Sequence, residues 1–258
     1  MTKIHPTAIV ESGAWLDEGV EVGPYSVIGA HVKIGRGSWI GPHVVLQGRT
    51  EIGSRNKFYQ FVSVGEAPQD LKYKGEPTCL RIGDENVFRE GVTVHLGTPG
   101  GKGITTLGDN NLLMAYSHVA HDCEIGSSVV LANSAALAGH VWMGDYAILG
   151  GLCGVHQFVR IGESALIGAG SMVAMDISPF MIAQGDRANL RGVNVIGLER
   201  RGFPSDAIEK IQWAYKLIFR SKLKLEEALV RVTQKMGETP EVARLVDFIR
   251  SSERGVCR

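Results

Sequence analysis

The chain lacks the features that send proteins to or through a membrane. Its N-terminus has no basic segment followed by an apolar run, and no stretch of about 18 apolar residues occurs anywhere, so we expect neither a secretory signal nor a membrane-spanning helix. Its 27 lysines and arginines balance its 27 aspartates and glutamates, which leaves no field that would attract nucleic acid or an acidic membrane surface. The sequence predicts a cytoplasmic protein without membrane insertion or nucleic-acid binding.

Cysteine and aromatic residues are also scarce. The four cysteines form no C-x-x-C pair, which fits reduced thiols better than a disulfide framework or a zinc cluster. Aromatic residues make up only 7% of the chain, whereas 33 of the 258 residues are glycine. A chain of this length buries a sizeable core, and so many glycines imply tight backbone positions that recur along it.

The most informative feature is a period of six. An apolar residue recurs at every sixth position from Ile4 to Val64, often followed by glycine, as at Ile34-Gly35. This period fits neither an amphipathic helix nor an alternating strand. Three hexads close a triangular coil of short strands with the apolar residues inside, and coils stack about 4.8 Å apart. We expect the glycine to relieve the corner, where a Cβ would be strained.

Two segments interrupt the repeat. Residues 65–81 form an insertion that leaves the phase intact, because Ile82 lies at a whole multiple of six from Val64. After GTPGGKGIT (97–105) the phase slips by one residue, and it then runs from Leu107 to Val173. The sequence therefore predicts two loops that leave the coil.

The C-terminal part changes to helical spacing. Three segments place apolar residues on one face, with Ser205 and Thr239 as predicted helix caps. We predict a β-helix over residues 1–190 and a small helical domain over residues 191–258.

Histidines gather in the middle of the chain. In SHVAHDCEIG, Asp122 follows His121, and an aspartate beside a histidine orients the ring and stabilises its protonated form, unless the pair is simply a solvated turn. His118 and His140 are 22 residues apart, about one coil, which places them near the same edge. The H-x-x-H spacing also permits zinc, as in the trimeric β-helix carbonic anhydrases.

Charged segments outside the repeat are further candidates. The first insertion carries Gln69, Asp70 and Lys72 on a loop bounded by glycine and proline, which is either solvated or available for a phosphate or a sugar hydroxyl. Arg200 and Arg201 either grip a phosphate or belong to the ordinary surface.

Several motifs in a fixed order carry a resemblance to one family. YQF-x-S-x-GE-x-x-QDLKYKGEPT, HVAHDC, LAGHV, VHQF and RRGF followed by AYKLIFRS resemble the UDP-N-acetylglucosamine 3-O-acyltransferases of lipid A biosynthesis over nearly the whole chain. The resemblance implies a left-handed parallel β-helix and a homotrimer with its sites between subunits. It also implies transfer of a 3-hydroxyacyl chain from acyl carrier protein to the glucosamine 3-hydroxyl of UDP-N-acetylglucosamine, without cofactor or metal.

The same likeness implies roles for individual residues. His121 matches the general base, Asp122 the residue that orients it, and Gly139 the N–H donor to the oxyanion. Ala169 matches a position that limits acyl-chain length, and alanine there predicts a shorter chain than glycine does. The residues expected to bind substrate are Gln69, Asp70, Lys72, His118, His140, His156, Gln157, Asn194, Arg200 and Arg201.

The sequence departs from the best-known members at two positions. Ile196 stands where they carry glutamate, and Leu96 where they carry arginine, which affects the expected uridine contacts. A 3-amino UDP-sugar remains an alternative acceptor, and a binding or structural β-helix without catalysis remains an alternative class. Basic residues of the helical region offer a surface for an acidic carrier protein: Lys216, Arg220, Lys222 and Lys224.

Overall fold

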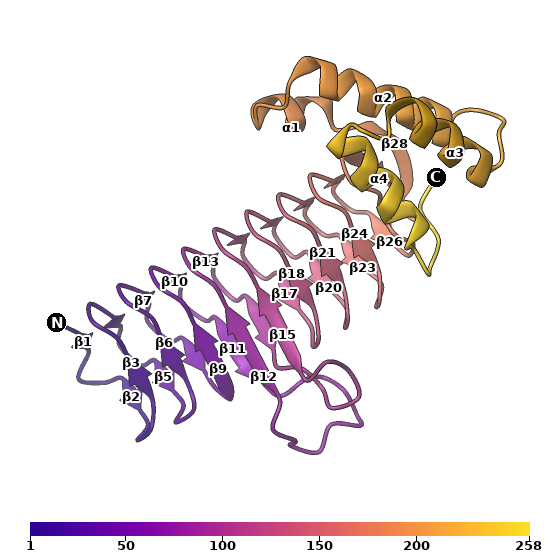
Figure 1. Ribbon diagram of the computed structural model, residues 1–258. Helices are drawn as coiled ribbons and strands as arrows, with labels where there is room; N and C mark the ends of the chain where they lie inside the picture. The colour runs from indigo at the N-terminus through magenta and orange to yellow at the C-terminus, as the bar shows by residue number, and fades with distance from the viewer.

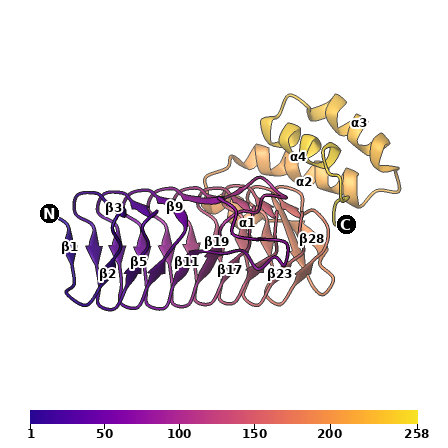
Figure 2. The same cartoon turned by 90° about the horizontal axis from the view of Figure 1, so that it is seen from below.

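The computed structural model describes residues 1–258 and consists of stacked triangular coils that end in a group of helices. Each coil contributes one short strand to each of three sheets, so neighbouring strands within a sheet come from successive coils and run parallel; only the last pair, Met181–Gln184 with Asn189–Val193, is antiparallel. Figure 1 shows the coils running from the N-terminus to the helices, and Figure 2 shows the helices over one side of the last coils. This arrangement confirms the β-helix that the period of six predicts.

The three sheets contain eleven, nine and eight strands. The eleven-stranded sheet consists of β1 (Lys3–Ile4), β4 (Glu21–Val22), β7 (Trp39–Ile40), β10 (Lys57–Phe58), β13 (Val87–Phe88), β16 (Leu112–Leu113), β19 (Val130–Leu131), β22 (Ile148–Leu149), β25 (Leu166–Ile167), β27 (Met181–Gln184) and β28 (Asn189–Val193). The nine-stranded sheet consists of β2 (Ile9–Val10), β5 (Val27–Ile28), β8 (Val45–Leu46), β11 (Ser63–Glu66), β14 (Thr93–His95), β17 (His118–Val119), β20 (Ala136–Leu137), β23 (Gly154–Val155) and β26 (Met172–Val173). The eight-stranded sheet consists of β3 (Trp15–Leu16), β6 (Lys33–Ile34), β9 (Arg49–Ile52), β12 (Cys79–Ile82), β15 (Ile104–Leu107), β18 (Glu124–Ile125), β21 (Trp142–Met143) and β24 (Arg160–Ile161).

The repeated apolar residues fill the inside of the coil, as the sequence predicts. Ile28, Ile34 and Ile40 are fully buried, and in the middle of the coil Phe58 stacks on Phe88 with ring centroids 4.5 Å apart. One cluster of 59 buried apolar residues extends from the first coils into the helices. Because each coil repeats the inward position of the one before, the core is continuous along the axis.

The corners explain why glycine follows so many inward residues. A methyl group on Gly35 would lie 2.6 Å from the carbonyl carbon of Gly53 in the next coil, so the glycine permits close stacking. The left-handed backbone conformation falls two residues later, at Gly37 in this turn and at non-glycine residues such as Tyr25 and His140 elsewhere. The prediction that glycine avoids a steric clash at the corner is therefore confirmed, whereas the left-handed position of the turn does not require glycine.

Both predicted loops leave the same corner of the coil. Residues 67–78 join β11 to β12, and residues 96–103 join β14 to β15, so each loop runs from the nine-stranded to the eight-stranded sheet. Figure 1 shows them projecting together below the coil. We call this corner the loop edge. The corner from the eleven-stranded to the nine-stranded sheet carries Tyr25, Phe61, Tyr116 and Leu152 with exposed side chains, and we call it the aromatic edge.

The C-terminal region contains four helices, one more than the sequence predicts: α1 (Val195–Arg200), α2 (Ser205–Phe219), α3 (Leu225–Met236) and α4 (Pro240–Arg250). The additional helix, α1, has only six residues, too few for a periodic pattern to stand out. Thr239 is the N-cap of α4, as expected, but Ser205 is the first residue of α2 and Pro204 is the cap. The predicted domain boundary at 190/191 falls within β28. None of the helices combines the length and hydropathy that a membrane span requires.

Candidate active site

The loop edge brings together residues from three successive turns. The turn after β17 carries His121 and Asp122, the turn after β20 carries Gly139 and His140, and the next turn begins with His156. Because one coil is 18 residues long, His140 stacks above Asp122, while His118 pairs in register with Ala136. The 22 residues between His118 and His140 are one coil of 18 plus four more, so the two histidines lie on neighbouring coils and both flank His121.

His121 and Asp122 form the hydrogen bond that the sequence predicts. The distance from His121 Nδ1 to Asp122 Oδ2 is 2.8 Å. A carboxylate only accepts, so Nδ1 carries the proton, and in the neutral form of the ring the lone pair is on Nε2. Since Asp122 is buried and His121 is partly exposed, the carboxylate holds the ring from the protein side, and the opposite side of the ring is accessible to a substrate.

The second loop holds the carboxylate of Asp122. Its Oδ2 accepts hydrogen bonds from the Thr98 hydroxyl at 2.6 Å and the Thr98 N–H at 3.0 Å, and its Oδ1 accepts from the Gly103 N–H at 3.1 Å. Burial raises the pKa of Asp122, but the hydrogen bonds from Thr98 and His121 outweigh that effect and leave the pKa below its usual value. Asp122 therefore stays ionised and keeps its hold on the His121 ring.

Sequence reasoning did not find Thr98. The only signal in the sequence was the phase slip, which located the loop but not the side chain within it. Gly101 also lies against the carboxylate, since a methyl group there would be 2.5 Å from Asp122 Cγ. The loop is thus wrapped closely around the aspartate.

Gly139 lies directly against the Cε1–Nε2 edge of the His121 ring. A methyl group on Gly139 would be 2.5 Å from Cε1 and 2.7 Å from Nε2 of His121. The backbone N–H of Gly139 donates to no acceptor in the chain. Only glycine permits this approach, and the N–H is free to bind an oxyanion formed beside the imidazole.

His140 is packed between two rings. It meets His121 edge-on, with centroids 5.1 Å apart, and stacks on Phe158 at 4.3 Å. Burial lowers the pKa of His140, which the nearby Asp122 partly opposes. The ring is therefore mostly neutral near pH 7 and available as a hydrogen-bonding group.

His118 is also neutral. Burial, followed by the neighbouring His95 and His121, lowers the pKa of His118 to about 4. Its Nδ1 lies 2.7 Å from the Thr93 hydroxyl on the preceding strand. His118 thus has a fixed ring orientation and no charge at neutral pH.

Three side chains at this site are potential metal ligands. Ligand atoms of His121, Asp122 and His140 all lie within 4.8 Å of one another. However, Oδ2 of Asp122 already accepts hydrogen bonds from Thr98 and His121, and a metal between Asp122 and His121 would have to replace the latter. The arrangement favours an oriented base over a zinc ligand set.

A groove of about 720 Å³ runs from this cluster along the outside of the nine-stranded sheet. The first loop contributes Gln69 at one end, and His156 lies farther along. Asp70 is close enough for its charge to oppose in part the lowering of the His140 pKa by burial, and its carboxylate accepts a hydrogen bond from the Lys72 N–H at 2.9 Å. The structure thus brings Gln69, Asp70 and His156 to the same edge as His121, with Lys72 and Gln157 exposed nearby.

Four predicted residues lie elsewhere in this chain. Asn194 caps α1 and binds the carbonyl of Ser164, while Arg201 stacks on Tyr146 and hydrogen-bonds Ser164, beside the corner where the eight-stranded sheet passes to the eleven-stranded one. Arg200 is next to them. Ala169 is exposed at the aromatic edge. None of the four lines the groove beside His121.

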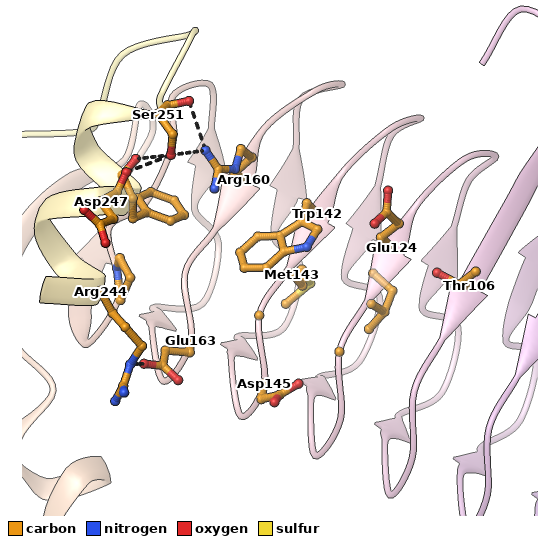
Figure 3. Close-up of a pocket in the computed structure, with 15 residues that line it drawn as sticks. Thr106, Glu124, Trp142, Met143, Asp145, Arg160, Glu163, Arg244, Asp247 and Ser251 are labelled. Carbon is orange, nitrogen blue, oxygen red and sulfur yellow. Dashed lines mark hydrogen bonds and ion pairs between the residues drawn. The ribbon is translucent and has the colours of Figure 1, made fainter. Parts of the chain in front are cut away.

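Another hollow, of about 690 Å³, lies between α4 and the eight-stranded sheet. Figure 3 shows Arg244 paired with Glu163 and Arg160 bound to Ser251 across it. Arg160 also covers the rings of Trp142 and Phe248. Because Arg244 and Arg160 already have partners within the chain and attach α4 to the coil, we assign no substrate to this hollow.

The chain matches two sequence profiles. One, described as bacterial transferase hexapeptide (six repeats), matches residues 104–139, and the other, described as UDP-N-acetylglucosamine O-acyltransferase, domain 2, matches residues 176–257. The coil and these two matches place the protein in the class of hexapeptide-repeat acyltransferases.

Full-length relatives make the assignment specific. The chain is 52% identical to the acyl-[acyl-carrier-protein]–UDP-N-acetylglucosamine O-acyltransferase of Paraburkholderia phymatum and 49% identical to that of Thermodesulfovibrio yellowstonii, covering 100% of each. The structure of LpxA from Acinetobacter baumannii superimposes with a TM-score of 0.96 at 42% identity, covering 99% of both chains. The Arabidopsis UDP-N-acetylglucosamine acyltransferase gives 0.86 at 37% identity, covering 99% of this chain and 100% of that one. The chain belongs to the acyl-[acyl-carrier-protein]–UDP-N-acetylglucosamine O-acyltransferase family, the enzymes of the first step of lipid A biosynthesis.

Proposed function

We propose that this enzyme transfers a 3-hydroxyacyl chain from acyl carrier protein to the 3-hydroxyl of UDP-N-acetylglucosamine by direct attack, in the cytoplasm. His121 Nε2 takes the proton of the sugar hydroxyl as its oxygen bonds to the thioester carbonyl carbon. The Gly139 N–H binds the resulting oxyanion. When the carbon–sulfur bond breaks, the protonated ring returns the proton to the leaving thiolate, so no acyl-enzyme forms.

One observation carries this proposal. Gly139 packs against the Cε1–Nε2 edge of the His121 ring, its N–H is unpaired, and both residues line the same apolar-walled groove. A base next to an oxyanion donor is what acyl transfer to a hydroxyl requires. Gln69, Asp70, Lys72, His118, His140, His156 and Gln157 surround this point and are the proposed sugar and donor contacts.

We infer that two copies of the chain complete each site. Asn194, Arg200 and Arg201 stand at a different corner from His121, so within one chain they cannot reach the same substrate. A second copy that packs its eleven-stranded sheet against the nine-stranded sheet of the first would bring this corner to the groove. The two arginines would then bind the diphosphate, which suits their paired guanidinium groups.

The surface chemistry supports a closed trimer. The outer face of the eight-stranded sheet carries ion pairs such as Lys33–Glu51 and Arg81–Glu51. The aromatic edge instead exposes 71% of Tyr116 and 69% of Leu152. Three copies that turn this edge toward a common axis bury the apolar side chains and leave the charged sheet in water.

Lysines of the helical region are the proposed docking surface for the acidic carrier protein. Lys216, Lys222 and Lys224 are exposed, whereas Arg220 donates to the Tyr215 hydroxyl and the Leu190 carbonyl. Arg220 therefore fixes α2 to β28, and the lysines remain for the partner.

The direct test is acyl transfer by purified protein from 3-hydroxyacyl carrier proteins to UDP-N-acetylglucosamine or its 3-amino analogue, with products identified by mass spectrometry. We expect the hydroxyl acceptor to be used. Exclusive use of the amine would overturn the acceptor assignment, and activity that is lost with a chelator and restored by Zn²⁺ would favour the metal hypothesis.

The trimer has its own test. Leu152→Glu places a charge on the aromatic edge, so we expect a smaller particle by analytical ultracentrifugation and a parallel loss of activity. Glu51→Gln on the charged sheet is the control. A monomeric variant with full activity would show that each chain contains a complete site.

A further inference from the structure

On the outer face of the nine-stranded sheet, two small residues are followed by one large residue at the C-terminal end. Along the last four strands the outward positions are His118, Ala136, Gly154 and Met172, paired in register from coil to coil. All four line the groove that begins at His121. Two small residues thus form a smooth floor that leads away from the base, and a long side chain stands at its end.

Met172 lies across this floor. Its Sδ is 2.9 Å from the point that a methyl group on Gly154 would occupy, so the side chain is folded back over the glycine toward the base. The residue remains 43% exposed, so much of its side chain is accessible from the groove. An unbranched thioether in such a position fills space at the end of an apolar channel.

The chain beyond Met172 turns polar. Residues 185–188 cross the end of the sheet, where the Met172 N–H donates to the Gly185 carbonyl and the Ala188 N–H donates to the Met172 carbonyl. Asp186 and Arg187 line the groove there with exposed side chains. A hydrocarbon chain that passed Met172 would have to dehydrate these charges, which is costly.

We propose that Met172 sets the length of the acyl chain that this enzyme accepts, a specificity role that rests on the proposed acyl transfer. The acyl chain lies on Ala136 and Gly154, and its end meets the Met172 thioether. Truncation of Met172 opens about one coil height, about 4.8 Å. This length corresponds to roughly four methylene groups, since a zigzag of about 1.5 Å bonds advances roughly 1.25 Å per carbon.

The proposal differs from the expectation for Ala169. That residue is exposed at the aromatic edge and does not line the groove of its own chain, whereas Met172 does. Met172 thus limits the length of the acyl chain from within the groove of its own chain. Substitutions of Ala169 and of Met172 can therefore be tested separately.

The test measures kcat/KM as a function of donor chain length, for each variant and for the unchanged enzyme. The donors are 3-hydroxyacyl carrier proteins with 8 to about 18 carbons, a range wide enough to show a shift of one coil height to shorter or to longer chains. We expect Met172→Ala to shift the optimum by two to about four carbons and to raise kcat/KM for the longer donors about tenfold or more, since each buried methylene contributes about fourfold. Met172→Leu keeps the volume and the original profile.

Met175→Ala is the matched control, because Met175 is also 43% exposed but lies outside the groove. A profile unchanged in Met172→Ala, or shifted equally in Met175→Ala, overturns the inference. If the preferred donor length shifts in Ala169→Gly but not in Met172→Ala, the residue that limits the acyl chain lies at the aromatic edge, and the inference is also overturned. Absence of transfer by the unchanged enzyme with every donor would contradict the proposed function itself, which separates the two failures.

Discussion

The loop edge and the aromatic edge have the same backbone and opposite chemistry. In both, a turn of about four residues with one left-handed residue joins two strands, as at His140 on the loop edge and Leu152 on the aromatic edge. The loop edge adds two insertions and buries a charged aspartate. The aromatic edge has no insertions and exposes apolar side chains.

The difference shows how a repeat acquires a site. The coil supplies identical positions every 18 residues, and a rigid backbone holds each side chain in place. Chemistry arises where an insertion supplies partners that the coil itself lacks, as Thr98 does for Asp122. Without such partners, the same turn offers only a surface.

Removal of His121, the proposed base, should have the largest effect. His121→Ala leaves no group to take the hydroxyl proton, and we expect kcat/KM to fall by about 10³-fold, within the usual range for general bases. His43→Ala, which removes an aromatic-edge histidine, should retain activity. Substrate binding measured by calorimetry should survive in both, and an active His121→Ala enzyme would reject the assigned base.

A methyl group at equivalent positions on the two edges sharpens the comparison. Gly139→Ala forces the His121 ring to move, and we expect kcat to fall about 10²-fold because the base loses its alignment. Gly151→Ala occupies the same place in a turn of the aromatic edge, where the nearest contact would be 3.2 Å from the Asn133 carbonyl, so activity should be nearly normal. Equal losses would indicate a general effect on folding.

The contribution of the second loop can be measured through pH. Thr98→Val removes the hydroxyl that donates to Asp122, so the pKa of Asp122 should rise. The ionised form is needed to orient His121 and is lost as pH falls through this pKa. The acidic limb of the kcat profile should therefore move to higher pH, with about a tenfold loss of kcat at neutral pH.

Thr106→Val is the control for this experiment, because Thr106 lies on β15 just after the loop and its side chain makes no hydrogen bond. A profile that stays fixed in Thr98→Val would show that the loop does not tune the aspartate.

The smallest effect is expected at His118. Its pKa of about 4 means that the ring is uncharged at neutral pH. His118→Gln should therefore leave the shape of the kcat profile unchanged between about pH 5 and 9, with less than a tenfold change in KM from an altered sugar contact. A new inflection near neutral pH would show that His118 titrates during catalysis.

The sequence predicted most of the fold around the candidate site, because the period of six gives the position of each strand. The period located every strand of the coil up to β26, and the phase slip located the loop after β14. The adjacent His121 and Asp122 were recognisable as a pair. Thr98 and Met172 were not, because their importance depends on contacts with residues 24 and 18 positions away, respectively, and no local pattern marks them.

By itself the sequence determined the coil, since burial of one apolar residue per hexad is a periodic requirement that can be read along the chain. Only the tertiary structure decided that both insertions emerge at one corner, that Asp122 is held by Thr98, and that Gly139 makes room for the His121 ring. These features depend on which residues stack above one another. The closure of each coil decides which residues lie next to each other on neighbouring coils, and these residues are far apart in the sequence.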